Sequence, residues 1–369
     1  MISHSSNLTG GGEDDFFRLI KYFSEKYYIV SVIPEGPRAE QFVKYSNEYL
    51  IIRDIIFPFL GFNIKKYINY LRISFLKIFK LIPFFKKHKD CKICFVNSSV
   101  CMLEVILLDL LNIPFVISIK EKIEPGFVRK IYYKYLNRNA KKIIVISDFL
   151  KNEFENEVSS KKISKIYSTI EEEYYLEIKQ NTVLVKKDDI YEIVCIGNIY
   201  PLKNQKLLVE AVSKSKHVNK IRIKFIGKVL DKKYYEHMLL KINEVKDNEI
   251  IFEFTGEKNK EEVIKQILNT FCIVITSKQE GMSIVLLESL FLEKPVVTTN
   301  VGIVPEIIIN EYNGIILKND SPQELANAID ELIDNNNLYV KIKENCLNTF
   351  LKNFKLEKYL KEHENVLFS

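Results

Sequence analysis

The sequence has no run of about 18 uncharged apolar residues, the length that a membrane-spanning helix needs. Its best candidate, residues 55–62, is short and follows Arg53 and Asp54. Residues 1–6 are polar and have neither the basic start nor the apolar core of a secretory signal. We therefore expect no membrane span and no secretion, and we expect any membrane contact to be peripheral.

The sequence is also poor in patterns that bind metals. Cys91 and Cys94 form a Cys-x-x-Cys at the start of a predicted strand, where residues three apart point to opposite faces, and no second Cys or His pair stands at zinc spacing. No Asp-x-Asp occurs, so a metal-chelated diphosphate has no obvious ligands. Since the six cysteines are scattered through apolar segments, we expect reduced, buried thiols, a reducing compartment and no metal.

What is present describes an ordinary globular protein. The 369 residues are 47% hydrophobic, 12% aromatic and 28% charged, which is enough for two domains with separate cores. The net charge of +6 favours anionic partners. Charge alone leaves nucleotides, lipid headgroups and nucleic acid open.

The first half of the chain alternates apolar runs with helical patterns, as parallel strands with crossover helices do. Residues 2–8 look like the tail of a strand, and the glycines at 10–12 separate it from a helical pattern. The missing part of this strand suggests that the true start lies upstream. Further strands are predicted at residues 28–33, 49–52, 93–97, 114–120 and 142–147. We expect a first domain at residues 1–170.

The second half repeats this alternation after a polar stretch, residues 171–190, which is predicted to be a linker. A second domain is expected at residues 191–353. Its strands are predicted at residues 192–196, 221–226, 250–254, 271–276 and 295–299. The fold class is therefore predicted to be α/β, with two doubly wound, Rossmann-like domains that face a cleft.

Three helices of the second half are predicted from local signals. Residues 259–262 and 321–324 have the capping pattern in which an Asn or Ser precedes a Glu by three places. Pro322 stands at the first helical position, where proline is tolerated. Residues 354–369 form an amphipathic pattern with no strand after it, and we expect this helix to pack back on the first domain.

A basic stretch, residues 64–89, contains no acidic residue. Its basic residues alternate with Tyr, Leu, Ile and Phe, and they are Lys65, Lys66, Arg72, Lys77, Lys80, Lys86, Lys87 and Lys89. An anionic membrane surface and a crossover helix with solvated lysines both explain this pattern. A similar stretch at residues 127–142 favours the membrane surface.

The most informative stretch runs from Ser277 to Glu288. It ends an apolar run, turns at Gly281 and begins a helical pattern, so Glu280 and Glu288 stand at a strand-to-helix junction, where open parallel sheets bind ligands. Carboxylates accept hydrogen bonds from the vicinal hydroxyls of ribose and hexose. Glu288 fits poorly as a surface residue, because its neighbours are apolar nearly all round, and a buried glutamate needs a partner.

Three more loops carry candidate ligands, two for phosphate and one, at Gly302, for phosphate or the base. The glycines at 10–12 precede a helix and can bring backbone amides close to an anion, although a purely structural turn is the alternative. Lys203, in the loop at 197–205, offers a cation to a diphosphate, although a solvated lysine is the alternative. Gly302 stands in the loop at 298–306, after the last predicted strand.

Together these residues resemble the retaining nucleotide-sugar glycosyltransferases called group 1 or family 4, which have the GT-B architecture. The most specific part is Glu280-Gly281-(x)6-Glu288, which is similar to the E-x7-E signature of that family. Lys203, the glycines at 10–12, and Gly302 with Glu306 support the resemblance, which covers nearly the whole chain. It implies a hexosyltransferase with a nucleotide-sugar donor and a glycan or lipid-linked acceptor, in surface polysaccharide synthesis, with no metal and no nucleic acid.

The resemblance also implies roles for individual residues. The catalytic residues would be Glu280, at the transferred sugar, and Lys203, at the diphosphate. Glu288 would bind the ribose hydroxyls. The other implied donor-binding residues are Gly11, Gly12, Asn198, Gly281, Met282, Ser283 and Gly302.

The chain departs from this family in two loops, besides its truncated first strand. Asn198 stands where most members have an arginine beside the diphosphate. Lys120 and Glu121 stand where many have a histidine, so they are expected on the acceptor side. Two alternatives stay open, namely a catalytically weakened sugar-nucleotide-binding subunit and a nucleotide-sugar epimerase. We expect a cytoplasmic protein at the inner face of the cell membrane, bound through residues 64–89.

Overall fold

The computed structural model describes residues 1–7, 11–53, 64–123, 126–155, 157–184, 190–245 and 250–368, with side chains of helix 64–87 described from residue 68 on. The chain divides into two compact units. Unit 1 is Met1–Ser168 together with Glu357–Ser369, and unit 2 is Thr169–Leu356. The expected domain ends, residues 170 and 354, differ from Ser168 and Glu357 by two and three residues.

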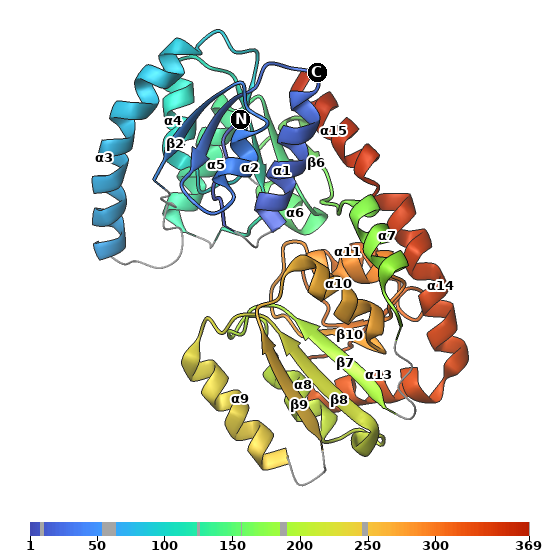
Figure 1. Cartoon of the computed structure of the whole chain (residues 1–369). Coiled ribbons are helices and arrows are strands. Elements are labelled where there is room, and N and C mark those ends of the chain that lie inside the picture. The colour runs from blue at the N-terminus through green and yellow to red at the C-terminus, as the bar shows by residue number, and fades with distance from the viewer. Residues whose placement is uncertain are drawn as a thin grey trace. The chain divides into compact units, whose positions relative to one another are not determined.

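Unit 1 is built on parallel strands, as the alternation of apolar and helical segments predicts (Figure 1). One group of strands pairs in the order β2-β1 and the other in the order β3-β4-β5-β6. These strands are β1 (Val30–Pro34), β2 (Glu48–Ile52), β3 (Cys94–Val96), β4 (Phe115–Ile119), β5 (Lys142–Val145) and β6 (Ile163–Lys165).

The first residues of the chain join these two groups of strands. Ile2 forms parallel bridges to Val32 of β1 and to Val96 of β3. Its amide donates to the carbonyl of Phe95 over 2.8 Å, and the amide of Val32 donates to the carbonyl of Met1 over 2.9 Å. The expected strand tail at residues 2–8 is thus present at Met1–Ser3, in the middle of the sheet.

The helices of unit 1 accompany these strands. They are α1 (Gly11–Ser24), α2 (Ala39–Val43), α3 (Ile64–Lys87), α4 (Met102–Leu110), α5 (Phe127–Asn139), α6 (Asp148–Glu155) and α15 (Leu356–Phe368). The basic stretch forms α3, which packs against α4 (Figure 1). Lys77 is not a surface lysine, as the sequence suggested, because it is buried and its Nζ lies 2.6 Å from Oε1 of Glu104. An unpaired buried charge is costly, so Lys77 serves the packing of α3 on α4.

Unit 2 contains a six-stranded parallel sheet in the order β12-β11-β10-β7-β8-β9. Each predicted strand of the second half is present, and β12 is one that the sequence pattern missed. The strands are β7 (Tyr191–Ile196), β8 (Ile221–Ile226), β9 (Ile251–Gly256), β10 (Cys272–Ile275), β11 (Val296–Thr298) and β12 (Ile315–Ile316). The direction of winding changes between β7 and β10, and ligands of such sheets bind outside the carboxyl ends of the strands at this point.

The helices of unit 2 follow the local signals where these are strong. They are α7 (Glu172–Asn181), α8 (Lys206–Val212), α9 (Lys232–Val245), α10 (Lys260–Asn269), α11 (Ile284–Phe291), α12 (Val304–Ile307), α13 (Pro322–Asp334) and α14 (Asn336–Asn353). Asn259 and Glu262 form a reciprocal capping box on α10, and Ser321 caps α13. The expected linker at 171–190 is wrong in its first half, which is α7 and buries Tyr175 and Ile178.

The cysteines are free, and five of the six are buried. Burial raises the pKa of the Cys195, Cys272 and Cys346 thiols to about 12, so these thiols stay protonated. The prediction of unpaired thiols in apolar surroundings is confirmed. In the described part of the chain, no helix is long and apolar enough to cross a membrane.

Helix α15 returns to unit 1 and packs against a buried ionic cluster. Asp15 binds Arg18 over 2.6 Å and Lys120 over 3.0 Å, and the Ser168 hydroxyl donates to it over 2.6 Å. Burial opposes the charge of Asp15, but Lys120 and Arg18 outweigh this and hold its pKa well below the usual range. His363 of α15 is buried beside this cluster, and burial lowers its pKa to about 4.

We predict that His363 makes the stability of the protein depend on pH. The unfolded chain, in which the pKa is 6.5, binds a proton more readily than the folded protein, so the free energy of unfolding should rise between about pH 4 and pH 6.5. At 1.36 kcal/mol per pKa unit the rise is roughly 3 kcal/mol. Urea denaturation of His363→Gln should show a flatter pH profile, whereas His237→Gln, which alters an exposed histidine, should keep the slope of the parent. Equal slopes in all three proteins would contradict this role.

Candidate active site

Three loops of unit 2 meet at the carboxyl ends of β7, β10 and β11. Pairing keeps β10 between β7 and β11, so the loops that follow these strands are neighbours. The Lys278 amide donates to the carbonyl of Leu202 over 2.8 Å. The Thr299 hydroxyl donates to the carbonyl of Ser277 over 2.6 Å. The segment that the sequence singles out, Ser277 to Glu288, is therefore tied to the loops on both sides of it.

Glu280 and Lys203, the two expected catalytic residues, form an ion pair. Lys203 Nζ contacts Glu280 Oε1, and the Ser277 hydroxyl donates to the same oxygen over 2.7 Å. The side chains of Lys203 and Glu280 are 25% and 10% exposed, so the pair is reachable but mostly shielded from water. The diphosphate of a ligand can replace Glu280 as the partner of Lys203, and hydroxyl groups of the ligand can replace Lys203 as the partner of Glu280.

The loop after β7 owes its shape to two glycines. Gly197 has φ +146° and Gly227 has φ +151°, and a Cβ on Gly227 would stand 2.2 Å from the carbonyl oxygen of Gly197. The side chain of Asn198 accepts a hydrogen bond from the Lys228 amide over 3.1 Å. Asn198 therefore links the loops after β7 and β8.

Gly302 lies directly against Glu280. Its φ is +56°, and a Cβ there would stand 1.9 Å from the backbone carbonyl oxygen of Glu280. Only glycine fits such an approach. The loop after β11 therefore supports the backbone that presents Glu280.

Helix α11 follows the turn that carries Glu280. Ser283 is its N-cap and accepts a hydrogen bond from the Leu286 amide. Gly281 and Met282 precede the cap and are half-buried. The amino end of a helix carries a partial positive charge, so the turn from Gly281 to Ser283 suits an anion.

Glu288 is buried in α11 and has the partner that its surroundings require. It is 6% exposed, and the hydroxyl of Tyr175 in α7 donates to its Oε1 over 2.5 Å. The prediction that Glu288 is buried and partnered is confirmed. Sequence reasoning missed Tyr175, because the polar stretch that contains it was assigned to a linker.

Unit 1 has its own polar cluster at the carboxyl ends of its central strands. Lys120 follows β4 and donates to the side chain of Asn97 over 2.8 Å, as well as binding Asp15. Glu121 accepts a hydrogen bond from Ser98 over 2.8 Å and one from Ser99. Both expected acceptor-side residues thus lie among polar groups, and each is already paired.

The glycine loop belongs to the same cluster. Thr9 and Gly10 lie outside the described residues, Gly11 begins α1, and a Cβ on Gly12 would stand 2.6 Å from the ring of His4. The Asn97 side chain donates to the carbonyl of Gly12 over 2.8 Å. Burial lowers the pKa of His4, which keeps its ring neutral. The sequence did not point to His4 or Asn97, although both follow strands of a parallel sheet.

No metal centre is placed among the residues that the structure describes. No group of three or more His, Cys, Asp or Glu side chains there could hold a metal ion. The carboxylates of Glu280 and Asp15 form ion pairs with Lys203 and Lys120.

Comparisons of the sequence with known proteins found a family model and relatives that match part of this chain. Residues 177–348 match the model of the family "Glycosyl transferases group 1". The uncharacterized glycosyltransferase MJ1178 of Methanocaldococcus jannaschii is 30% identical over 62% of this chain, and MJ1069 of the same organism is 28% identical over 66%. These matches span 59% and 64% of the two relatives' own lengths.

Solved structures are similar over the whole chain. The crystal structure of Anabaena Alr3699/HepE in complex with UDP and glucose has a TM-score of 0.79 at 15% identity, covering 100% of this chain and 98% of that one. A glycosyltransferase from Rickettsia africae has a TM-score of 0.79 at 18% identity, with 99% and 97% covered. These likenesses confirm the expected GT-B fold class. Residues 177–348, which make up most of unit 2, belong to the group 1 glycosyl transferases, the family that the sequence resembles.

Proposed function

We propose that the protein is a glycosyltransferase that moves a sugar from a nucleotide-diphosphate sugar to a glycan or lipid-linked acceptor, with retention at the anomeric carbon. The observation that carries the proposal is the Lys203–Glu280 pair beside the amino end of α11. The family of unit 2 and the UDP and glucose in the Anabaena structure support a nucleotide-sugar donor.

In this proposal each charged residue of the candidate site binds a different part of the donor. Lys203 and the backbone amides of Met282 and Ser283 bind the diphosphate, which gains negative charge as it leaves. Glu280 exchanges its bond to Lys203 for hydroxyls of the transferred sugar. Glu288 binds ribose hydroxyls, and Tyr175 fixes its carboxylate by occupying one oxygen. Gly302 leaves room for the backbone of Glu280.

The proposed reaction needs no protein base. The bond between the anomeric carbon and the diphosphate oxygen breaks, the acceptor oxygen forms a bond to that carbon, and the acceptor proton passes to an oxygen of the leaving phosphate. Positive charge that faces the diphosphate stabilises this step, and we propose that Lys203 and oriented amides supply it without a metal ion.

The polar cluster of unit 1 is proposed for the acceptor. Lys120 and Glu121 lie close together after β4, and His4 lies beside Asn97, so this edge offers donors and acceptors to hydroxyl groups. The pairing of Lys120 with Asp15 and of Glu121 with Ser98 holds both side chains in place. In this proposal they orient the acceptor.

A sugar-nucleotide-binding subunit with weak or no turnover is the second candidate. Asn198 favours it, because its side chain is used to link two loops and brings no positive charge to the diphosphate. The two candidates differ in turnover and agree in binding.

The exposed face of helix α3 supports the proposal that the protein binds peripherally to an anionic membrane. Its described outer face carries a row of apolar side chains that are about 60% exposed, namely Ile68, Leu71, Phe75, Leu76 and Phe79. Arg72, Lys80 and Lys86 are exposed beside this row, whereas Lys77 is buried. The side chains of Lys65 and Lys66 lie outside the described residues. An apolar row bordered by cations has the chemistry of a helix that lies in a membrane interface.

We predict turnover in a panel of nucleotide sugars assayed with glycan and lipid-linked acceptors by mass spectrometry. Lys203→Met and Glu280→Gln should each lower kcat by about 100-fold, the effect of removing one group that stabilises a transition state. Lys206→Met, three residues from Lys203, is the matched control and should keep the activity of the parent. EDTA should leave the rate unchanged, and a reaction of donor alone should not alter the sugar.

The outcomes separate the candidates. Nucleotide-sugar binding without turnover would favour the binding subunit. Full activity of Glu280→Gln would sink the assignment of the donor site.

We also predict sedimentation with anionic vesicles that weakens as salt is added, since screening reduces the attraction. The variant with Leu71, Phe75 and Phe79 changed to Ser should lose most of this binding. A separate variant with Lys80→Glu and Lys86→Glu should bind the vesicles more weakly than the parent at low salt. Leu230 and Leu240 of unit 2 are 57% and 59% exposed, so changing both to Ser is a matched control that should bind normally. Normal vesicle binding by the triple serine variant would refute this surface.

A further inference from the structure

The loops that follow β7 and β8 keep the register of these two strands. The strand pairing ends with Ile196 opposite Ile226. An isolated parallel bridge then joins Ile199 to Val229 with the same offset. The Ile199 amide donates to the carbonyl of Lys228 over 2.8 Å, as it does in a continuing parallel ladder. The two loops therefore run side by side beyond the ends of their strands.

Asn198 and Lys228 stand opposite each other in this register. A regular parallel ladder would pair the Lys228 amide with the backbone carbonyl of Gly197. The side chain of Asn198 accepts this hydrogen bond instead, over 3.1 Å. Gln205 is buried, and its side-chain amide donates to the carbonyl of Asn198 over 2.9 Å. Asn198 is thus held in place, and its side-chain oxygen fixes the backbone of Lys228.

The two loops meet next to the stem of Lys203. A Cβ on Gly197 would stand 3.5 Å from Cε of Lys203, which is ordinary contact. A Cβ on Gly227 would stand 2.2 Å from the carbonyl oxygen of Gly197, so the loop after β8 approaches this backbone as closely as glycine allows. Lys228 follows Gly227 directly. Its side chain therefore starts beside the backbone on which Lys203 packs.

The ammonium group of Lys228 can reach a ligand at this edge. Lys228 is exposed, and in the part of the chain that the structure describes its Nζ has no carboxylate partner. Two other lysines of this region differ, since Lys206 lies 3.4 Å from Glu210 and Lys203 is paired with Glu280. The flexible four-carbon stem of a lysine carries a point charge that suits a phosphate.

We propose that Lys228 is a second cation of the donor site, which binds the diphosphate from the loop after β8 while Lys203 binds it from the loop after β7. This inference rests on the proposed function. Asn198 is a positioning residue that holds the backbone of Lys228. Two cations neutralise more of the negative charge of the leaving diphosphate than Lys203 alone. Lys228 thereby compensates for the neutral side chain of Asn198, the feature that favours a subunit without turnover.

The test is isothermal titration of the intact chain with UDP, GDP, ADP, CDP and dTDP. For the nucleotide that binds the parent most tightly, Lys228→Met should lower the affinity about three- to tenfold, because an exposed charge contributes less than a buried one. Lys228→Arg keeps the charge and should keep the affinity of the parent. The loss in Lys228→Met should shrink as salt is added, and it should be smaller for the corresponding nucleoside monophosphate, which carries less charge.

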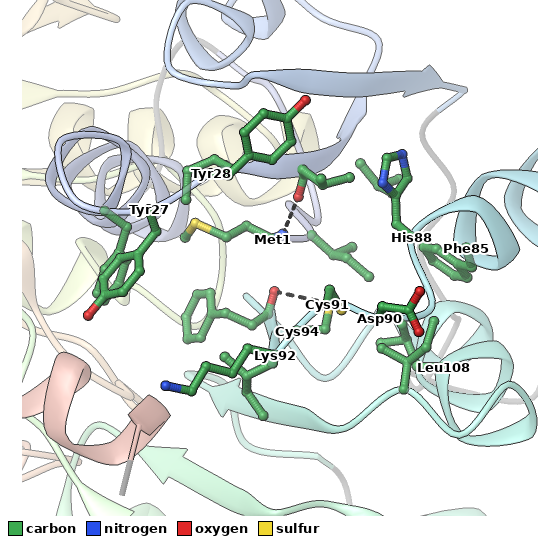
Figure 2. A pocket seen from close by; sticks show the side chains of 18 of the residues that line it. Met1, Tyr27, Tyr28, Phe85, His88, Asp90, Cys91, Lys92, Cys94 and Leu108 are labelled. Carbon is green, nitrogen blue, oxygen red and sulfur yellow. Dashed lines mark hydrogen bonds between the residues drawn. The ribbon is translucent and has the colours of Figure 1, made fainter.

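Two other lysines are matched controls for the removal of one positive charge. Lys232 is exposed and begins α9, further along the same segment. Lys92 belongs to unit 1, where it lines a mainly apolar cavity of about 420 Å³ at the amino ends of β1 and β3 (Figure 2). Lys232→Met and Lys92→Met should bind the diphosphate as the parent does. Thermal unfolding of each variant checks that it folds.

Asn198→Ala tests the positioning role. This change removes the acceptor of the Lys228 amide, so it should lower the affinity for the diphosphate. The double variant with Asn198→Ala and Lys228→Met should bind no more weakly than Lys228→Met, because both changes act through one ammonium group. Losses that add in the double variant would contradict the positioning role.

An affinity of Lys228→Met equal to that of the parent, while Lys203→Met binds more weakly, would overturn this inference and leave the proposed function standing. Equal losses in Lys228→Met, Lys232→Met and Lys92→Met would also overturn it, because net charge would then explain them. No binding of any nucleotide by the parent would overturn the proposed function and this inference together.

Discussion

Parallel strand pairing is the constraint on which the rest of the structure depends. It puts the carboxyl ends of neighbouring strands at one edge, so residues far apart in sequence meet there without any other device. In unit 2 this edge gathers Lys203, Glu280 and Gly302. In unit 1 it gathers His4, Asn97 and Lys120.

Each of the carboxylates at these edges has a partner, because an unpaired buried charge is costly. Glu280 is held by Lys203, Asp15 by Arg18 and Lys120, and Glu288 by the hydroxyl of Tyr175. Each partner lowers the cost of keeping a carboxylate out of water, and each also fixes its position. In the proposed function, the diphosphate and hydroxyls of the donor take over the bond between Lys203 and Glu280, whereas Tyr175 keeps its bond to Glu288.

Much of this arrangement is predictable from the sequence, and the parts that are not predictable have physical reasons. The strands of unit 2 and the caps at Asn259 and Ser321 depend on local signals, and they are present as expected. The junction from Ser277 to Glu288 is local too, so its place at a strand end could be predicted. The roles of these residues in a reaction stay predictions.

What could not be predicted depends on tertiary contacts. Lys77 looks like a surface lysine until Glu104 of a different helix is placed beside it. Tyr175 lies in a polar stretch whose composition hides a helix that is stabilised by packing, and hydrophobic periodicity gives no sign of its bond to Glu288. Asp15 and Asn97 stand in ordinary local patterns and become a cluster only when the sheet forms.

We propose that Glu288 and Lys203 bind a nucleoside diphosphate at the carboxyl edge of unit 2. Isothermal titration of the intact chain with a set of nucleoside diphosphates tests it most directly, with Glu288→Gln and Lys203→Met as the variants. We predict saturable binding of at least one nucleotide by the parent and an affinity about tenfold or more lower in each variant, since a hydrogen bond to a charged group contributes about 1.5–3 kcal/mol. Equal affinity in all three proteins, or no binding of any nucleotide by the parent, would contradict it.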